Sequence, residues 1–108
     1  MRGRAVDERF IAGQMRHGPR GAAELAETVD RLIDFAETTG AVPSMLIDLV
    51  HEAYVADPDV HAFLLRENPG AARAIAERLA RARRQGLWHP RRNDVDATLA
   101  AFLTETGA

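Results

Sequence analysis

The sequence predicts an all-α protein, folded as a single small domain of about six helices joined by short turns. Apolar residues recur at intervals of three and four along most of the chain, and no segment alternates with the period of two that a strand requires. Alanine fills 20 of the 108 positions and aromatic residues only 6%, which favours close packing between helices. Asx-Pro pairs and single glycines mark helix starts and ends, and one domain over residues 1–108 accounts for the length.

The first half of the chain contains three expected helices. Residues 5–16 show helical spacing weakened by Gly13, and residues 21–39 are strongly amphipathic up to Gly40. Residues 43–56 form the third, with Pro43 suited to the first turn. The expected buried stripe of this third helix is Leu46, Leu49 or Val50, and Ala53.

The stretch MRHGPRGAAEL separates the first two helices and places a histidine between arginines. Gly18 can adopt the left-handed conformation that ends a helix, and Pro19 cannot extend the helix. Gly21 allows a close approach into the next helix. The loop is therefore at least a helix terminator, and Arg16 and His17 are candidates for contact with a ligand.

Two helices of the second half begin with the same pattern. Asp57-Pro58 and Asn68-Pro69 each combine a capping side chain with a proline that lacks the unsatisfied donor. They predict a short helix over 58–67 and a longer one over 69–85, which Gly86 closes.

The segment after Gly86 is expected to be an extended linker over residues 87–92, followed by a helix to about residue 105 that Asn93 or Asp94 caps. Trp88 lies in this linker. The expected role of its ring is to cover the helix ends, with the indole N–H bonded to a carbonyl. Contact with a ligand is the alternative.

Charge is unevenly distributed along a chain whose net charge is −2 and whose 14 basic residues are all arginine. Residues 1–69 have a net charge of −5, residues 70–92 of +6 and residues 93–108 of −3. A local basic face on an acidic whole suits a protein or an anionic small molecule better than a nucleic acid. Four arginines are candidates for a partner-facing surface, and a solvated helix face is the alternative: Arg83, Arg84, Arg91 and Arg92.

The sequence predicts neither a metal site nor a catalytic group. There is no cysteine, and four histidines are the only nitrogen ligands. His51-Glu52 lacks a second histidine at the spacing of a zinc-protease helix, because Val55 occupies that position. No signal peptide or stretch of 18 apolar residues is present, so we expect a soluble cytoplasmic protein without a membrane partner.

The motifs above, taken in order, resemble the carboxyl-terminal segment of the large subunit of aerobic-type cobaltochelatase, a family related to the magnesium chelatase large subunit. The resemblance covers roughly residues 8 to 105. Pro19 replaces an aromatic residue usual in the family, and Gln85 stands where arginine is more common. The matching segments are RHGPRGA at 16–22, ETTG at 37–40, NPGA at 68–71, IAERL at 75–79 and QGLWHPRRN at 85–93.

The resemblance implies a part of an enzyme that inserts cobalt(II) into hydrogenobyrinic acid a,c-diamide, a corrin-ring precursor, during cobalamin biosynthesis. Separate AAA+ subunits of that enzyme hydrolyse ATP, and the implied partners are these subunits, the rest of the large subunit and the tetrapyrrole. Cobalt and ATP belong to the complete complex, and no cofactor is expected in this chain. The implied substrate-binding residues are Arg16, His17 and Trp88. The alternative is a non-catalytic helical module that docks partner subunits, and in either case we expect the isolated chain to be inactive.

Overall fold

A computed structural model of the protein describes residues 8–106. Within this range the chain forms helices and no strand, so the all-α prediction is confirmed. Residues 5–7 of the first expected helix lie outside the described residues. The elements are α1 (Glu8–Met15), α2 (Gly18–Thr39), α3 (Ser44–His51), the π-helical turn η2 (Glu52–Ala56), α4 (Pro58–Glu67), α5 (Pro69–Arg84) and α6 (Val95–Glu105).

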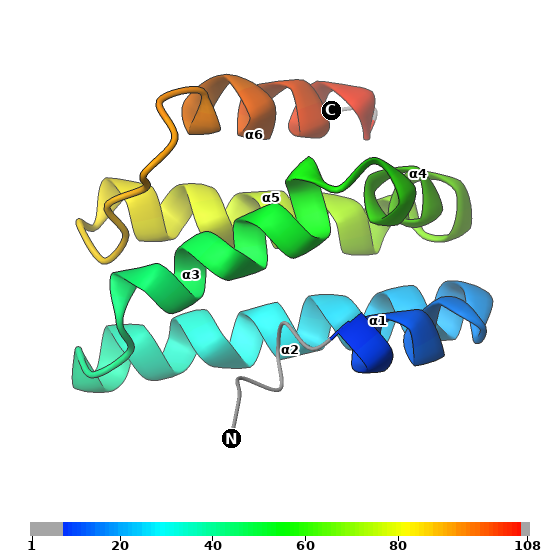
Figure 1. Ribbon diagram of the computed structural model, residues 1–108, viewed down its shortest axis with the longest axis horizontal. Coiled ribbons are helices and arrows are strands. Elements are labelled where there is room, and N and C mark those ends of the chain that lie inside the picture. Colours follow the sequence, from blue (N-terminus) through cyan, green and yellow to red (C-terminus); the bar gives the residue numbers. More distant parts are fainter. Residues whose placement is uncertain (1–7, 107–108) are drawn as a thin grey trace.

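Helix α5 is the centre of the bundle. It packs against α2 on one side and α6 on the other, and α3 crosses in front of the space between α2 and α5 (Figure 1). Alanines on its buried face let neighbouring helices approach closely. The buried residues of α5 are Ala71, Ala72, Ile75, Ala76, Leu79 and Ala82. None of the described helices combines the length and the apolar character needed to cross a membrane.

The Asx-Pro helix starts and the glycine helix ends are confirmed, but the predicted cap of the last helix is not, because Asp94 precedes α6 without a capping hydrogen bond from its side chain. The Asp57 carboxylate accepts hydrogen bonds from two amides in the first turn of α4, at 2.9 and 3.1 Å. Asn68 caps α5 in the same way, with one amide at 3.1 Å. Gly40 and Gly86 follow α2 and α5 with φ of +66° and +75°, a conformation that glycine adopts without strain.

The turn between α1 and α2 depends on two glycines. Gly18 has φ of +58°, as expected of a residue that ends α1, although α2 already begins at this residue and not at Gly21. A side chain at Gly21 would place its Cβ 1.7 Å from the Gln14 carbonyl oxygen. The backbones of α1 and α2 can therefore meet only because residue 21 is glycine.

The expected buried stripe of α3 was wrong in part. Val50 is buried, but Leu46 and Ala53 are only half-buried and Leu49 is 37% exposed. The buried side of α3 instead includes two polar residues, Asp48 and His51, because both find hydrogen-bond partners in the linker and α6. Pro43 precedes the helix as its N-cap residue and is not part of the first turn.

Candidate functional site

The three residues predicted to bind substrate do not come together in the structure. Arg16 and His17 are exposed at the turn between α1 and α2, where the Asn68 side-chain amide donates to the Pro19 carbonyl at 3.2 Å. Trp88 is fully buried in the linker, and its neighbour His89 bonds to Ser44 at the start of α3, which follows the other end of α2. Helix α2 has 22 residues and so separates the two ends by about 33 Å.

Trp88 belongs to a hydrogen-bonded cluster that fixes the linker on α3. Its indole N–H donates to one oxygen of Asp48, and Arg91 Nε donates to the other, both at 3.2 Å. One turn earlier on α3, the Ser44 hydroxyl accepts from the His89 amide at 2.7 Å. The prediction that Trp88 covers the core is confirmed, but its acceptor is a buried carboxylate and not a carbonyl.

His51 joins α3 to the linker and to α6, and its ring is fully buried. Its Nε2 lies 2.9 Å from the Thr98 hydroxyl, which itself donates to the Val95 carbonyl at 2.8 Å. The hydroxyl oxygen therefore accepts from Nε2–H. Its Nδ1 has no hydrogen-bond partner among residues 8–106.

Burial lowers the pKa of His51, and the nearby positive charge of Arg92 lowers it further. The carboxylates of Asp48, Asp94 and Glu52 act in the opposite direction with a smaller effect. Desolvation of the imidazolium therefore outweighs attraction to the surrounding acids. The His51 and Trp88 rings also have centroids 5.3 Å apart, so His51, Trp88 and Asp48 form a structural junction between α3 and the linker.

A second histidine stabilises the π-helical turn. His61 Nδ1 donates to the Val55 carbonyl of η2 at 3.0 Å, and Nε2 lies 2.8 Å from a Glu105 carboxylate oxygen near the end of α6. The ring also stacks on Phe102 with centroids 4.4 Å apart. His61 thus ties α4, η2 and α6 together and satisfies a carbonyl of the π-helix.

The arginines of residues 70–92 are mostly neutralised within the chain. Helix α5 lies between α2 and α6, and each of these helices presents carboxylates to it. Six of the seven arginines form ion pairs: Arg73–Glu77, Arg78–Asp30, Arg81–Glu37, Arg83–Asp96, Arg91–Asp48 and Arg92–Asp94. Arg84 has no carboxylate partner among the described residues, so it alone of the four predicted partner-facing arginines keeps an uncompensated charge.

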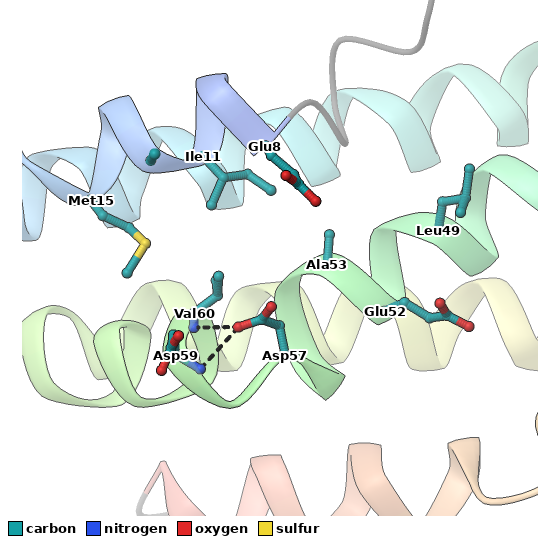
Figure 2. A pocket seen from close by; sticks show the side chains of 10 residues that line it. Glu8, Ile11, Met15, Leu49, Glu52, Ala53, Asp57, Asp59 and Val60 are labelled. Atoms are coloured by element: carbon teal, nitrogen blue, oxygen red, sulfur yellow. Dashed lines mark hydrogen bonds between the residues drawn. The ribbon is translucent and has the colours of Figure 1, made fainter.

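A pocket of about 460 Å³ opens between α1, the junction of α3 with η2, and the start of α4. Its apolar lining includes Ile11, Met15 and Val60, and Figure 2 shows Met15 extending from α1 toward α4. Four carboxylates from these elements also line this pocket, and no arginine, lysine or histidine does. We call it the acidic pocket; its carboxylates belong to Glu8, Glu52, Asp57 and Asp59.

The carboxylates of the acidic pocket are largely unsatisfied. Asp57 uses one oxygen to cap α4, as the dashed lines in Figure 2 show. Within residues 8–106, Glu8, Glu52 and Asp59 make no hydrogen bond or ion pair. In the same range, no three histidine or acidic side chains are placed to hold a metal ion. The pocket is suited to a group that combines apolar surface with positive charge.

Sequence reasoning missed the acidic pocket and the cluster around Asp48. The pocket residues come from three separate helices, and no spacing along the chain connects Glu8 with Asp59. Asp48 and His51 could have been found, because two polar residues three positions apart share one helix face with the apolar Ile47 and Tyr54 close by.

The comparisons with known proteins define the class to which this fold and these motifs belong. The sequence model of the CobN/Magnesium Chelatase family matches residues 1–95. The chain therefore belongs to the CobN/magnesium chelatase family. A magnesium-chelatase subunit from Chlorobaculum parvum is 26% identical over 87 residues, which is 81% of this chain and 7% of that protein.

The individual relatives that match with higher identity are cobaltochelatase subunits. The chain is 41% identical over 104 residues to an aerobic cobaltochelatase subunit CobN from a Sinorhizobium species, covering 96% of this chain and 8% of the relative. The corresponding Pseudomonas aeruginosa subunit is 44% identical over 82% of this chain and 7% of its own. The solved catalytic subunit of cobaltochelatase from Mycobacterium tuberculosis superposes with a TM-score of 0.91 at 35% identity, over 96% of this chain and 9% of that one. The chain thus spans less than a tenth of the relatives that it matches.

Proposed function

We propose that this chain is part of the large subunit of an ATP-dependent cobaltochelatase and contributes to the insertion of cobalt(II) into hydrogenobyrinic acid a,c-diamide during cobalamin biosynthesis. The observation that carries the proposal is the TM-score of 0.91, at 35% identity, with a cobaltochelatase catalytic subunit. Identities of 41% and 44% to two cobaltochelatase subunits, against 26% to a magnesium-chelatase subunit, support cobalt as the metal substrate.

The partners that follow from this proposal are the rest of the large subunit, the AAA+ subunits that hydrolyse ATP, and the tetrapyrrole, all in the cytoplasm. Arg16 and His17 are exposed and have no ion pair among the described residues, so they are available to a macrocycle carboxylate. Trp88 would act indirectly, because its buried ring holds the linker on α3. Arg84 is the arginine best placed for a partner subunit.

The second candidate function is a non-catalytic module that docks partner subunits. It is favoured by one observation: most of the polar side chains singled out in the sequence are engaged in internal contacts, such as Arg91 with Asp48 and His51 with Thr98. Such a module would support chelation by holding the large subunit and its partners in place.

A chimeric large subunit tests whether this chain supports cobalt insertion. The 108-residue chain replaces the matching segment of the Sinorhizobium large subunit, and cobalt insertion is followed spectroscopically with the AAA+ subunits, ATP, Co(II) and hydrogenobyrinic acid a,c-diamide. We expect the chimera to be active and the subunit without the segment to be inactive. A chimera that folds but inserts no cobalt would contradict the proposal.

A variant in this chimera separates the two candidate functions. His17→Ala removes an exposed side chain at the α1–α2 turn without opening the core. A raised KM for the macrocycle with an unchanged assembly of subunits indicates substrate binding. Unchanged KM and kcat indicate that the chain acts as a docking module.

A further inference from the structure

We propose that the acidic pocket is a docking site for an apolar segment carrying arginine or lysine, supplied by the part of the large subunit that lies outside this chain. This inference rests on the proposed function, because it assigns a partner to one surface of the same subunit. It concerns the pocket between α1, the α3–η2 junction and α4, and not the motif-bearing turn at Arg16 and His17.

The apolar part of this surface is uncovered. Leu49 lines the pocket and is 37% exposed, and Met45, one turn earlier on α3, is 62% exposed. With Phe35, these are the large apolar side chains that the described part of the chain leaves in solvent. Apolar surface that adjoins a pocket is typical of a contact with another polypeptide.

Charge identifies the chemistry of the occupant. The acidic pocket gathers four carboxylates and no cationic side chain, and Glu8, Glu52 and Asp59 have no partner within residues 8–106. Elsewhere in the molecule carboxylates that adjoin helix α5, such as Asp30 and Glu37, are paired with arginine. An arginine or lysine at the rim of the pocket would give the three carboxylates the partner that residues 8–106 do not provide.

Charge also argues against a second copy of the chain as the occupant. A symmetric dimer through this surface would bring the same acidic residues face to face, and like charges oppose such contacts. The covering segment more naturally comes from the large subunit itself, since this chain corresponds to only 9% of the solved catalytic subunit that it matches. The pocket of about 460 Å³ is large enough for a few side chains, and Met15 can adapt its shape to them.

Cysteine labelling measures whether the pocket is covered. The chain has no cysteine, so Ala12→Cys places a single thiol on the pocket wall, and Ala97→Cys places a control thiol on the exposed face of α6. Maleimide labelling is compared between the isolated chain, which has its own hydrophobic core, and the chimeric large subunit, with mass spectrometry of the labelled peptide. We expect Ala12→Cys to react about tenfold more slowly in the chimera, because docking excludes solvent, while Ala97→Cys reacts at the same rate in both.

The charge requirement is measured in the same chimera. The double substitution Glu8→Lys and Glu52→Lys should restore fast labelling of Ala12→Cys. The control substitutes Glu24→Lys and Glu27→Lys, which make an equal change of charge at exposed positions of α2, and labelling should stay slow. Equal labelling of Ala12→Cys in chain and chimera would overturn the proposal, and so would protection that survives the charge reversal. Cobalt insertion by the chimera is measured in parallel. Fast labelling in a chimera that inserts cobalt would refute only the docking site. Slow labelling in a chimera that inserts no cobalt would refute only the proposed function.

Discussion

The two strongly charged regions of this molecule differ in how their charge is compensated. The arginines of residues 70–92 are concentrated in the sequence, yet six of the seven are paired with carboxylates of the folded chain. Three carboxylates of the acidic pocket lie within residues 52–59 and Glu8 joins them from α1, with no cation among the lining residues. Charge density along the chain is therefore a poor guide to which surface can attract a partner.

The difference follows from the place of each region in the bundle. Helix α5 lies between two other helices, so its arginines reach acids such as Asp30 on α2 and Asp96 on α6. The acidic pocket lies at the edge, where α1 and α4 leave an opening in front of η2 (Figure 2). The arginines of α5 that face acids of α2 and α6 are neutralised, whereas Arg84, at the C-terminal end of α5, and the carboxylates of the acidic pocket are not paired within residues 8–106.

The largest effect should come from closing the space between α1 and α2. In Gly21→Ala the new Cβ would meet the Gln14 carbonyl, so α1 must move away and the acidic pocket loses a wall. We expect a loss of about 3 kcal/mol in the free energy of unfolding, measured with urea. Gly13→Ala is the control: its Cβ meets nothing within 4 Å, and a gain of about 0.5–1 kcal/mol is expected in a helix. Equal stability of the two variants would show that α1 contributes little to the fold.

A smaller loss is expected at the junction between α3 and the linker. Asp48→Ala removes the acceptor of the buried Trp88 indole and the partner of Arg91, which should cost about 2 kcal/mol and shift tryptophan fluorescence to the red. Arg84→Gln, which breaks no ion pair within the described residues, should change stability by less than about 0.5 kcal/mol. If Arg84→Gln is the more damaging variant, the distinction between paired and unpaired arginines is wrong.

The parts of the fold that sequence could predict are those that local chemistry decides. The prediction that Asp57-Pro58 and Asn68-Pro69 start helices is confirmed. It could be made from sequence because a capping side chain bonds only to amides in the first turn of its own helix. The buried face of α3 depends instead on distant residues. Asp48 can be buried only because Trp88 and Arg91 are there to pair with it, so a pattern that assigns aspartate to solvent selects the wrong face.

The candidate site shows the same division. Sequence reasoning identified Arg16, His17 and Trp88 from their motifs. It could not show that Arg16 and His17 precede α2 while the linker that contains Trp88 meets the start of α3, beyond the other end of α2. Nor could it indicate that Arg83 would be paired with Asp96, since that depends on how the linker returns α6 to α5. Tertiary packing decides which charges remain available.

The pH dependence of stability at His51 links the two regions, because the charges of Arg92 and of Glu52, which lines the acidic pocket, both act on the pKa of its ring. Burial lowers its pKa below 6.5 in the folded state, so the unfolded chain binds the extra proton first. Stability should therefore fall as pH drops below about 6.5. Thermal unfolding between pH 7.5 and 5.5 should show a shallower decline for His51→Gln, which keeps a donor for Thr98. Identical pH profiles for both proteins would show that His51 does not titrate differently on folding.

The smallest expected effect concerns a single carboxylate of the acidic pocket. Glu52 is the first residue of η2, makes no hydrogen bond or ion pair within residues 8–106 and shares the pocket with other acids. Glu52→Gln should therefore raise the free energy of unfolding by about 0.3 kcal/mol at low salt, because it relieves repulsion between the acids of the pocket.

Glu37→Gln is the matched change on the compensated side, where the carboxylate is 21% exposed and paired with Arg81 through two hydrogen bonds. It should lower stability by about 1 kcal/mol, since both bonds to the guanidinium are weakened. Urea titrations at 20 mM and 1 M NaCl provide the measurement, and salt should abolish the gain at Glu52 while leaving most of the loss at Glu37. A loss at both positions would mean that Glu52 is compensated within the isolated chain, and the acidic pocket would then need no cation from outside.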